Sequence, residues 1–249
     1  MRRRGPTTLD LAQPRTVLEV LATSLRLYGR YPVLFLLLAL LVVAPYDLIV
    51  LAVTHTAPLG QQKGAASTIL ILTLVEFALV GPFVSALQVQ ALVTLSQGEQ
   101  PDLLDLIRRG VMVLPVVAAA EIIAGIGIGL GLILFVIPGV FLALRWAVVA
   151  QVAAIERTDW PGALRRSAQL ARLNYLRIFV VLFIVSVINL ALIDAGASLA
   201  GTTRHAPEVI LGIAVTTITR SFEALALAVL YFDLRARETA RPPEPGRMA

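Results

Sequence analysis

The stretch VLPVVAAAEIIAGIGIGLGLILFVI, residues 113–137, carries one ionisable side chain, Glu121, and decides the fold class. A helix rises 1.5 Å per residue, so about 20 apolar residues cross the roughly 30 Å hydrocarbon core of a bilayer. Pro138 and Gly139 then interrupt the helix, and a second apolar run follows at 140–155. The pattern predicts a hairpin of two helices that spans a membrane.

Four more apolar runs lie outside this hairpin, at 33–53, 67–95, 178–200 and 207–232. The 249-residue chain is 58% hydrophobic and only 15% charged, whereas soluble domains are about 25% charged. We therefore predict an all-α fold, a polytopic membrane helix bundle of six transmembrane helices. One membrane domain, 14–237, holds hairpins at about 14–95, 101–155 and 159–232, between disordered tails at 1–13 and 238–249.

The basic residues lie on alternate connections between the runs. Seventeen of the 21 Lys and Arg lie before the first run, between the second and third, between the fourth and fifth, or after the sixth. The four exceptions are Lys63, Arg145, Arg204 and Arg220. Because basic residues accumulate in cytoplasmic loops, we expect a protein of the cytoplasmic membrane with both termini cytoplasmic. Anionic headgroups beside these loops account for the net charge of +5 without a nucleic-acid partner.

Short amphipathic stretches precede the first, third and fifth runs, starting near Pro14, Pro101 and Pro161. Each separates charged from apolar side chains in the manner of helices that lie in the membrane interface, so three cytoplasmic interfacial helices are expected. Two explanations stay open. Either a unit of interfacial helix plus hairpin occurs three times, or any bundle in this orientation gathers basic amphipathic connectors on the cytoplasmic side.

Several short motifs follow one another in a recognisable order: Gly81 with Pro82, IRRG at 107–110, IPGVFLALRW at 137–146, ALRRSAQLAR at 163–172 and YFDLRAR at 231–237. Together they resemble the bacterial glycerophosphoryl diester phosphodiesterase membrane-domain family over about 14–237. The IPG turn, the Arg-bearing span after it and the ALRRS helix are the most specific part. The resemblance implies a six-helix membrane module whose own activity is not established.

The phosphodiesterase activity in the name of that family is not implied for this chain. It belongs to a fused soluble barrel that needs metal-binding acids and paired histidines, and this chain has only His55 and His205. The family pattern usually places Gly after the ALRRS helix, where this chain has Leu173 and Asn174. We therefore expect Asn174 to end that helix.

Seven ionisable side chains fall within the predicted spans: Asp47, Glu76, Glu121, Arg145, Asp194, Arg220 and Glu223. Glu121 and Arg145 lie at similar depth on adjacent spans, so we expect them to pair across the hairpin. Arg220 and Glu223 are three residues apart and are expected to pair on one helix face. Such charges either fix helix register as structural ion pairs or mark an ion path, a proton relay or a headgroup contact.

Two further features indicate contacts. The basic face of the ALRRS stretch, with Arg165, Arg166 and Arg172, is a candidate site for an anionic lipid headgroup. The glycines at 125, 127, 129 and 131 form two overlapping glycine-x-x-x-glycine spacings, which allow close helix approach. We expect this contact inside the bundle rather than in a dimer, although the sequence leaves the oligomeric state open.

The sequence lacks the motifs of catalytic and cofactor-binding sites. There is no cysteine, phosphate-binding loop, serine elbow or metal-binding histidine pair, so we expect no enzyme activity and no cofactor. An outer metal site of His55 and His205, completed by Asp47 or Asp194, is the alternative. The leading interpretation is a non-enzymatic structural or accessory membrane module that contacts lipid or a partner membrane protein. The alternative is a transporter or channel for a small solute or ion.

Overall fold

The computed structural model describes residues 11, 13–59, 64–156, 158–200 and 206–240. Every regular element in these ranges is helical. In chain order they are α1 (Val17–Arg30), α2 (Pro32–Thr54), α3 (Ala66–Val75), the π-helical turn η1 (Glu76–Val80), α4 (Gly81–Ser96), α5 (Leu103–Leu134), α6 (Val136–Arg145), α7 (Val149–Ile155), α8 (Trp160–Ala171), α9 (Tyr175–Ala200) and α10 (Ala206–Thr239).

Within the described ranges, six helical segments are long and apolar enough to cross a membrane: Pro32–Thr54, Ala66–Ser96, Leu103–Leu134, Val136–Ile155, Tyr175–Ala200 and Pro207–Thr239. Large apolar side chains such as Leu48, Ile71 and Leu176 are exposed on their outer surfaces. A water-soluble protein rarely exposes so much apolar surface, whereas a bilayer accepts it. The chain is a multi-pass membrane protein with an all-α bundle, as the sequence predicts.

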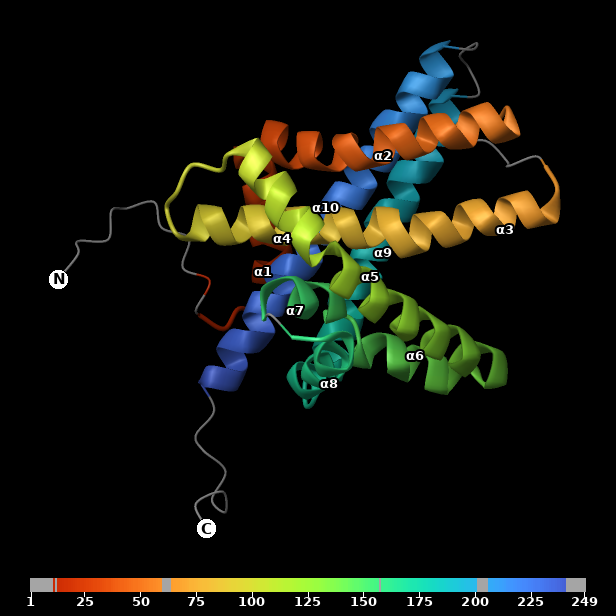
Figure 1. Cartoon of the computed structure of the whole chain (residues 1–249). Coiled ribbons are helices and arrows are strands. Elements are labelled where there is room, and N and C mark those ends of the chain that lie inside the picture. The colour runs from red at the N-terminus through yellow and green to blue at the C-terminus, as the bar shows by residue number, and fades with distance from the viewer. Residues whose placement is uncertain (1–10, 12, 60–63, 157, 201–205, 241–249) are drawn as a thin grey trace.

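Helix α10 lies at the centre of the bundle, where it packs against α1, α2, α4 and α9. In Figure 1 the three hairpins converge on the side where α1 and the C-terminal end of α10 lie, and their turns point away from that side. We call the side of α1 and the end of α10 the terminal side. Both ends of the described chain therefore lie on one side of the bundle, as an even number of crossings requires.

Helices α1 and α8 form as separate amphipathic elements, as predicted. Thr16 and Glu19 make a capping box at the start of α1, in which the Thr16 N–H donates to the Glu19 carboxylate and lowers the pKa of Glu19. Asp159 caps α8 by accepting from the Gly162 N–H. Polar side chains thus satisfy the free N–H groups of the first turns and fix where each helix begins.

The separate interfacial helix predicted after Pro101 is wrong. Asp102 caps the helix there, but α5 continues without interruption from Leu103 to Leu134 and includes the third span. Gly110 lies inside α5, and a Cβ built on it would lie 2.6 Å from Leu87 Cδ2, so α4 packs directly against this helix. Only the first and third hairpins carry a separate preceding helix, and the structure therefore does not show three equal units.

The turn of the second hairpin also differs from the prediction. The chain reverses at Phe135, whereas Pro138 lies in the first turn of α6, where a missing N–H costs no hydrogen bond. Gly139 then allows α6 to approach α5, because a Cβ on Gly131 would lie 2.9 Å from the Gly139 Cα. The close approach through these glycines is inside the bundle, as expected from the spacing.

The fourth span is not one helix. It consists of α6 and α7, separated by a turn at residues 146–148. After α8, the left-handed conformation falls on Leu173, with φ of 70°, while the Asn174 side chain donates to the Leu170 carbonyl at 3.3 Å. The prediction that Asn174 ends this helix is therefore wrong: α8 ends at Ala171, Leu173 takes the left-handed conformation, and Asn174 only adds a side-chain hydrogen bond.

The predicted tails differ in how far they can be checked. Helix α10 runs to Thr239 and so includes the first residues assigned to the tail at 238–249. In the segment 1–13, Leu11 is buried in the core and is only 8% exposed. Residues 1–10, 12 and 241–249 lie outside the described residues, so the disorder predicted for them stays a prediction.

Candidate functional site

Arg220 lies in the middle of α10 and forms an ion pair with Glu76, the first residue of η1. The predicted pair of Arg220 with Glu223 on one helix face is therefore wrong. The Glu223 carboxylate instead accepts a 3.4 Å hydrogen bond from Asn189 of α9. Arg220 reaches across the bundle because Glu76 offers a carboxylate on the helix that faces it.

The π-helical turn η1 sets the position of Glu76. The Gly81 N–H bonds to the Glu76 carbonyl, five residues earlier, and Pro82 follows without an N–H of its own. Proline inside a span removes one hydrogen bond of the regular ladder, and a local change of winding accommodates this loss. Single π turns inside helices are frequent at functional sites.

Glu121 of α5 does not pair with Arg145, contrary to the prediction. Arg145 ends α6 and is exposed, and no ion pair of the described residues includes it. The turn at 146–148 carries it toward α8, where Ser167 donates to its backbone carbonyl. A cation at the C-terminal end of a helix is favourable without a partner. Glu121 lies instead beside Gly81 of α4.

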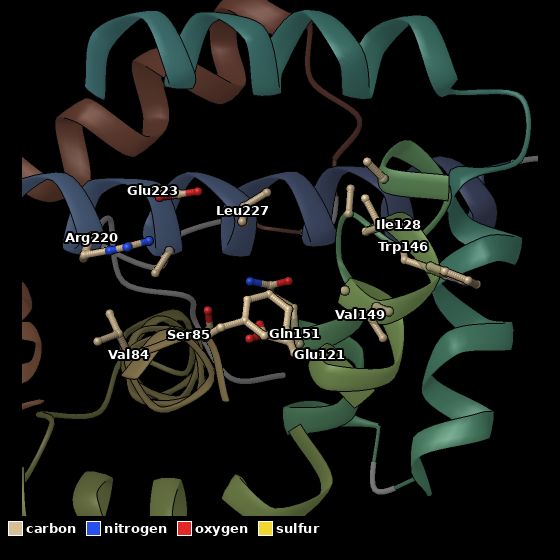
Figure 2. Close-up of a pocket in the computed structure, with 18 of the residues that line it drawn as sticks. Val84, Ser85, Glu121, Ile128, Trp146, Val149, Gln151, Arg220, Glu223 and Leu227 are labelled. Carbon is tan, nitrogen blue, oxygen red and sulfur yellow. The ribbon is translucent and has the colours of Figure 1, made fainter. Parts of the chain in front are cut away.

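A cavity of about 470 Å³ lies where the three hairpins meet, and we call it the central cavity. Its lining includes Glu76, Glu121, Gln151, Arg220 and Glu223. In Figure 2, α10 carries Arg220 and Glu223 along one wall, and the Gln151 amide lies between that wall and Glu121. The structure therefore brings together side chains from η1, α5, α7 and α10.

A second cavity, of about 360 Å³, lies beside the first, and we call it the side cavity. Asp47 and Tyr46 of α2 and Asn189 of α9 line it. Asp47 accepts a 2.6 Å hydrogen bond from Thr216 of α10 and is 7% exposed. Because Glu76, Arg220 and Glu223 line both cavities, the ion pair of Arg220 with Glu76 stands at their boundary.

Acidic side chains outnumber basic ones in the lining of the two cavities. Among the described lining residues there are four carboxylates, Asp47, Glu76, Glu121 and Glu223, and one guanidinium, Arg220. Walls of low dielectric strengthen the field of like charges, so such a cavity attracts cations and repels anions. Asp194, by contrast, is exposed on α9 and lines neither cavity.

Gln151 is the cavity residue that sequence reasoning missed. It is fully buried, with 0% exposure, and neither its Oε1 nor its Nε2 has a hydrogen-bond partner. Buried amides in proteins are almost always paired. The signal available in the sequence was a glutamine inside an apolar run. It was missed because only ionisable residues were selected as candidates.

A separate set of charges lies on the terminal side of the bundle, and we call it the Asp233 cluster. The Asp233 carboxylate of α10 is 0% exposed and accepts from Arg177 at 3.3 Å, from Arg237 at 3.1 Å and from the Arg15 N–H at 2.6 Å. Arg177 and Arg237 also donate to the Arg15 carbonyl. This cluster joins the segment before α1 to α9 and α10.

Arg166 belongs to another ion-pair network on the same side. It donates two 2.6 Å hydrogen bonds to Glu238 and one of 2.9 Å to Glu156. The hydrogen bonds with Glu238 are the main reason that the pKa of Arg166 is raised. Partial burial of the guanidinium acts in the opposite direction but is the smaller effect. Arg166 is therefore engaged within the protein, whereas Arg165 and Arg172 are exposed and stay candidates for a lipid headgroup.

No family model, no curated protein and no solved structure matches this chain. For the alternative of an outer metal site, His205 lies outside the described residues, and the described part of the chain contains no group of three or more His, Asp and Glu that could hold a metal ion.

Proposed function

We propose that this multi-pass membrane protein is a transporter that moves a small solute or ion through its two cavities, without catalysing a reaction. The observation that carries the proposal is the shared lining of the cavities by Glu76, Arg220 and Glu223. Ionisable residues are expensive within a bilayer, and those that face an internal cavity commonly belong to a substrate or proton path. A purely structural role needs one acid for Arg220, and this region has four.

The position of Arg220 suggests how passage is controlled. Its ion pair with Glu76 lies at the boundary of the cavities, where side chains of the first and third hairpins meet. Breaking and remaking this pair would join or separate the central and side cavities. Transporters commonly place such sites near the middle of the bilayer, at irregular helical segments, and η1 supplies one here.

Liposome flux tests the proposal. The full chain is reconstituted, and influx is followed for protons with an enclosed pH-sensitive dye and for sodium, potassium and labelled small amines. We expect flux of at least one probe above that of protein-free vesicles, and its loss in Arg220→Ala and Glu223→Ala. Asp194→Asn, an acidic residue outside both cavities, should keep the flux. Wild-type flux that is absent for every probe, or unchanged in Arg220→Ala, refutes the proposal.

The orientation and the family complete the proposal. We place both termini in the cytoplasm on the distribution of Arg between the loops, and we assign the chain to the glycerophosphoryl diester phosphodiesterase membrane-domain family on its motifs. Reporter fusions test the orientation: a reporter that is active only in the cytoplasm should be active at either end of the chain. Activity of a periplasmic reporter at either end contradicts it.

A second candidate function is an accessory module that docks on anionic lipid. The observation in its favour is the exposure of Arg165 and Arg172 on α8. Flotation of the reconstituted protein with soluble headgroup competitors tests it, since Arg165→Gln with Arg172→Gln should lower the apparent affinity for anionic lipid. Equal affinity of the variant and the wild type would leave the transporter as the sole candidate.

A further inference from the structure

The amide of Gln151 needs a partner that the protein does not supply. It is 0% exposed on α7, and both of its polar atoms lack a hydrogen bond. Burial without a partner is costly for an amide, because it loses its bonds with water and gains none. In Figure 2 this amide lies within the lining of the central cavity, so a bound molecule with N–H donors can supply the hydrogen bond that Gln151 Oε1 lacks.

The carboxylates around Gln151 are also incompletely paired. Glu121 makes no hydrogen bond or ion pair within the described part of the chain, and it faces the same cavity. Glu223 accepts one long hydrogen bond from Asn189. Arg220, the only guanidinium among the described lining residues, is paired with Glu76. The cavity therefore offers several acceptors and negative charge, and a complementary ligand supplies donors and positive charge.

The rest of the lining is apolar and fits the carbon part of such a ligand. Phe77, Leu182 and Leu227 line the cavity. Its volume of about 470 Å³ lies in the range of ordinary small-molecule sites. A bare metal ion suits it poorly, because the described residues contain no group of three or more His, Asp and Glu that could hold one.

We propose that the central cavity binds a small organic cation, a primary amine with an apolar body. A primary ammonium carries three N–H donors and one positive charge, which match Gln151 Oε1 and the carboxylates of Glu121 and Glu223. The apolar body lies against Phe77, Leu182 and Leu227. The inference rests on the proposed transport function, for which it names the class of solute.

Thermal unfolding of the detergent-solubilised full chain provides the binding test. The probe is 2-phenylethylammonium, compared with 2-phenylethanol, which has the same body without charge, and with N,N,N-trimethyl-2-phenylethylammonium, which keeps the charge without N–H donors. A ligand that binds the folded state raises the unfolding temperature as its concentration increases. We expect the largest rise with the primary amine. An equal rise with the alcohol, or none with any of the three, overturns the proposal.

Two nearly isosteric variants assign the binding to the cavity. Glu121→Gln should weaken amine binding about tenfold to a hundredfold, since it removes a charged acceptor, and Gln151→Leu about threefold to tenfold. The matched controls are Asp194→Asn and Gln169→Leu, which change exposed side chains outside both cavities. Unchanged affinity in both cavity variants refutes the site even if the amine binds.

The outcomes separate this inference from the proposed function. Amine binding that depends on Glu121 and Gln151, without flux of any probe in liposomes, supports the site and refutes transport. Proton or sodium flux that depends on Arg220, without amine binding, supports transport and refutes the class of ligand. A rise in unfolding temperature with sodium chloride alone, against a potassium chloride control, counts against the organic cation.

Discussion

The Asp233 cluster and the central cavity both hold charged side chains, but of the two only the Asp233 cluster gives its carboxylate several donors. The buried Asp233 carboxylate accepts hydrogen bonds from the side chains of Arg177 and Arg237 and from the backbone N–H of Arg15. In the cavity, Glu121 and Gln151 have no partner within the described residues. A saturated cluster holds helices together, whereas an unsaturated one keeps hydrogen-bonding capacity for something else. The difference separates the charges that stabilise this bundle from those to which we assign the proposed transport.

The largest effect is expected in the Asp233 cluster. Asp233→Leu leaves two guanidinium groups beside each other with no carboxylate, and it should destabilise the folded protein by about 3 kcal/mol, as breaking a buried ion pair does. The measurement is the unfolding temperature and the monodisperse yield in detergent. Asp194→Leu, which removes an exposed carboxylate, is the control. Equal losses in the two variants would remove the structural role given to the cluster.

Glu121→Leu should have the opposite sign. Since the carboxylate has no partner in the described part of the chain, replacing it should stabilise the fold by about 1 kcal/mol. Thermal unfolding without added amine measures the change. A loss of stability as large as that of Asp233→Leu would show that Glu121 is a structural group, and the contrast between the two regions would fail.

A pair of double-mutant cycles sharpens the contrast inside the cavity. Arg220→Leu with Glu76→Leu should show a coupling energy of about 1 kcal/mol, because the two side chains form an ion pair. Arg145→Leu with Glu121→Leu should be additive within about 0.5 kcal/mol, as expected for side chains without shared partners. Both cycles use thermal unfolding. Coupling in the second cycle alone would restore the pair predicted from the sequence.

The smallest effect concerns Arg166. Lysine keeps the positive charge but lacks the planar fork that binds Glu238 through two hydrogen bonds, so Arg166→Lys should destabilise by about 0.5 kcal/mol. Arg165→Lys, on the exposed face of the same helix, should have no measurable effect. Chemical denaturation in mixed detergent can resolve the two variants. Identical midpoints would mean that the network around Arg166 adds no stability.

Most of the fold could be predicted because it follows from local composition. An apolar run of about 20 residues is a span wherever it occurs, and a polar residue such as Asp159 before an amphipathic stretch starts a helix. Local sequence patterns predicted the ends and interruptions of helices less well than the spans themselves. The turn falls at Phe135 rather than at Pro138, because a proline is tolerated in a first helical turn. The stretch after Pro101 is not a separate helix, since α5 runs from Leu103 to Leu134.

The sequence predicted which charged residues form the site, but it did not predict which of them pair. All seven residues selected from the sequence lie in helical segments. Four of them, Glu76, Glu121, Arg220 and Glu223, line one cavity. Both predicted pairs were wrong, since spacing and depth along a helix do not fix the direction in which a side chain points. Asp233 was missed because it lies just beyond the predicted span at 207–232, and Gln151 because only ionisable side chains within the spans were selected.

The sequence by itself determined that this chain crosses a membrane six times and where each crossing lies, because the transfer of apolar side chains into lipid depends on composition and length alone. Tertiary structure decided which charges meet. The π turn at Glu76, the reversal at Phe135 and the rotation of α10 among its neighbours direct the side chains, and each depends on packing between segments far apart in the chain.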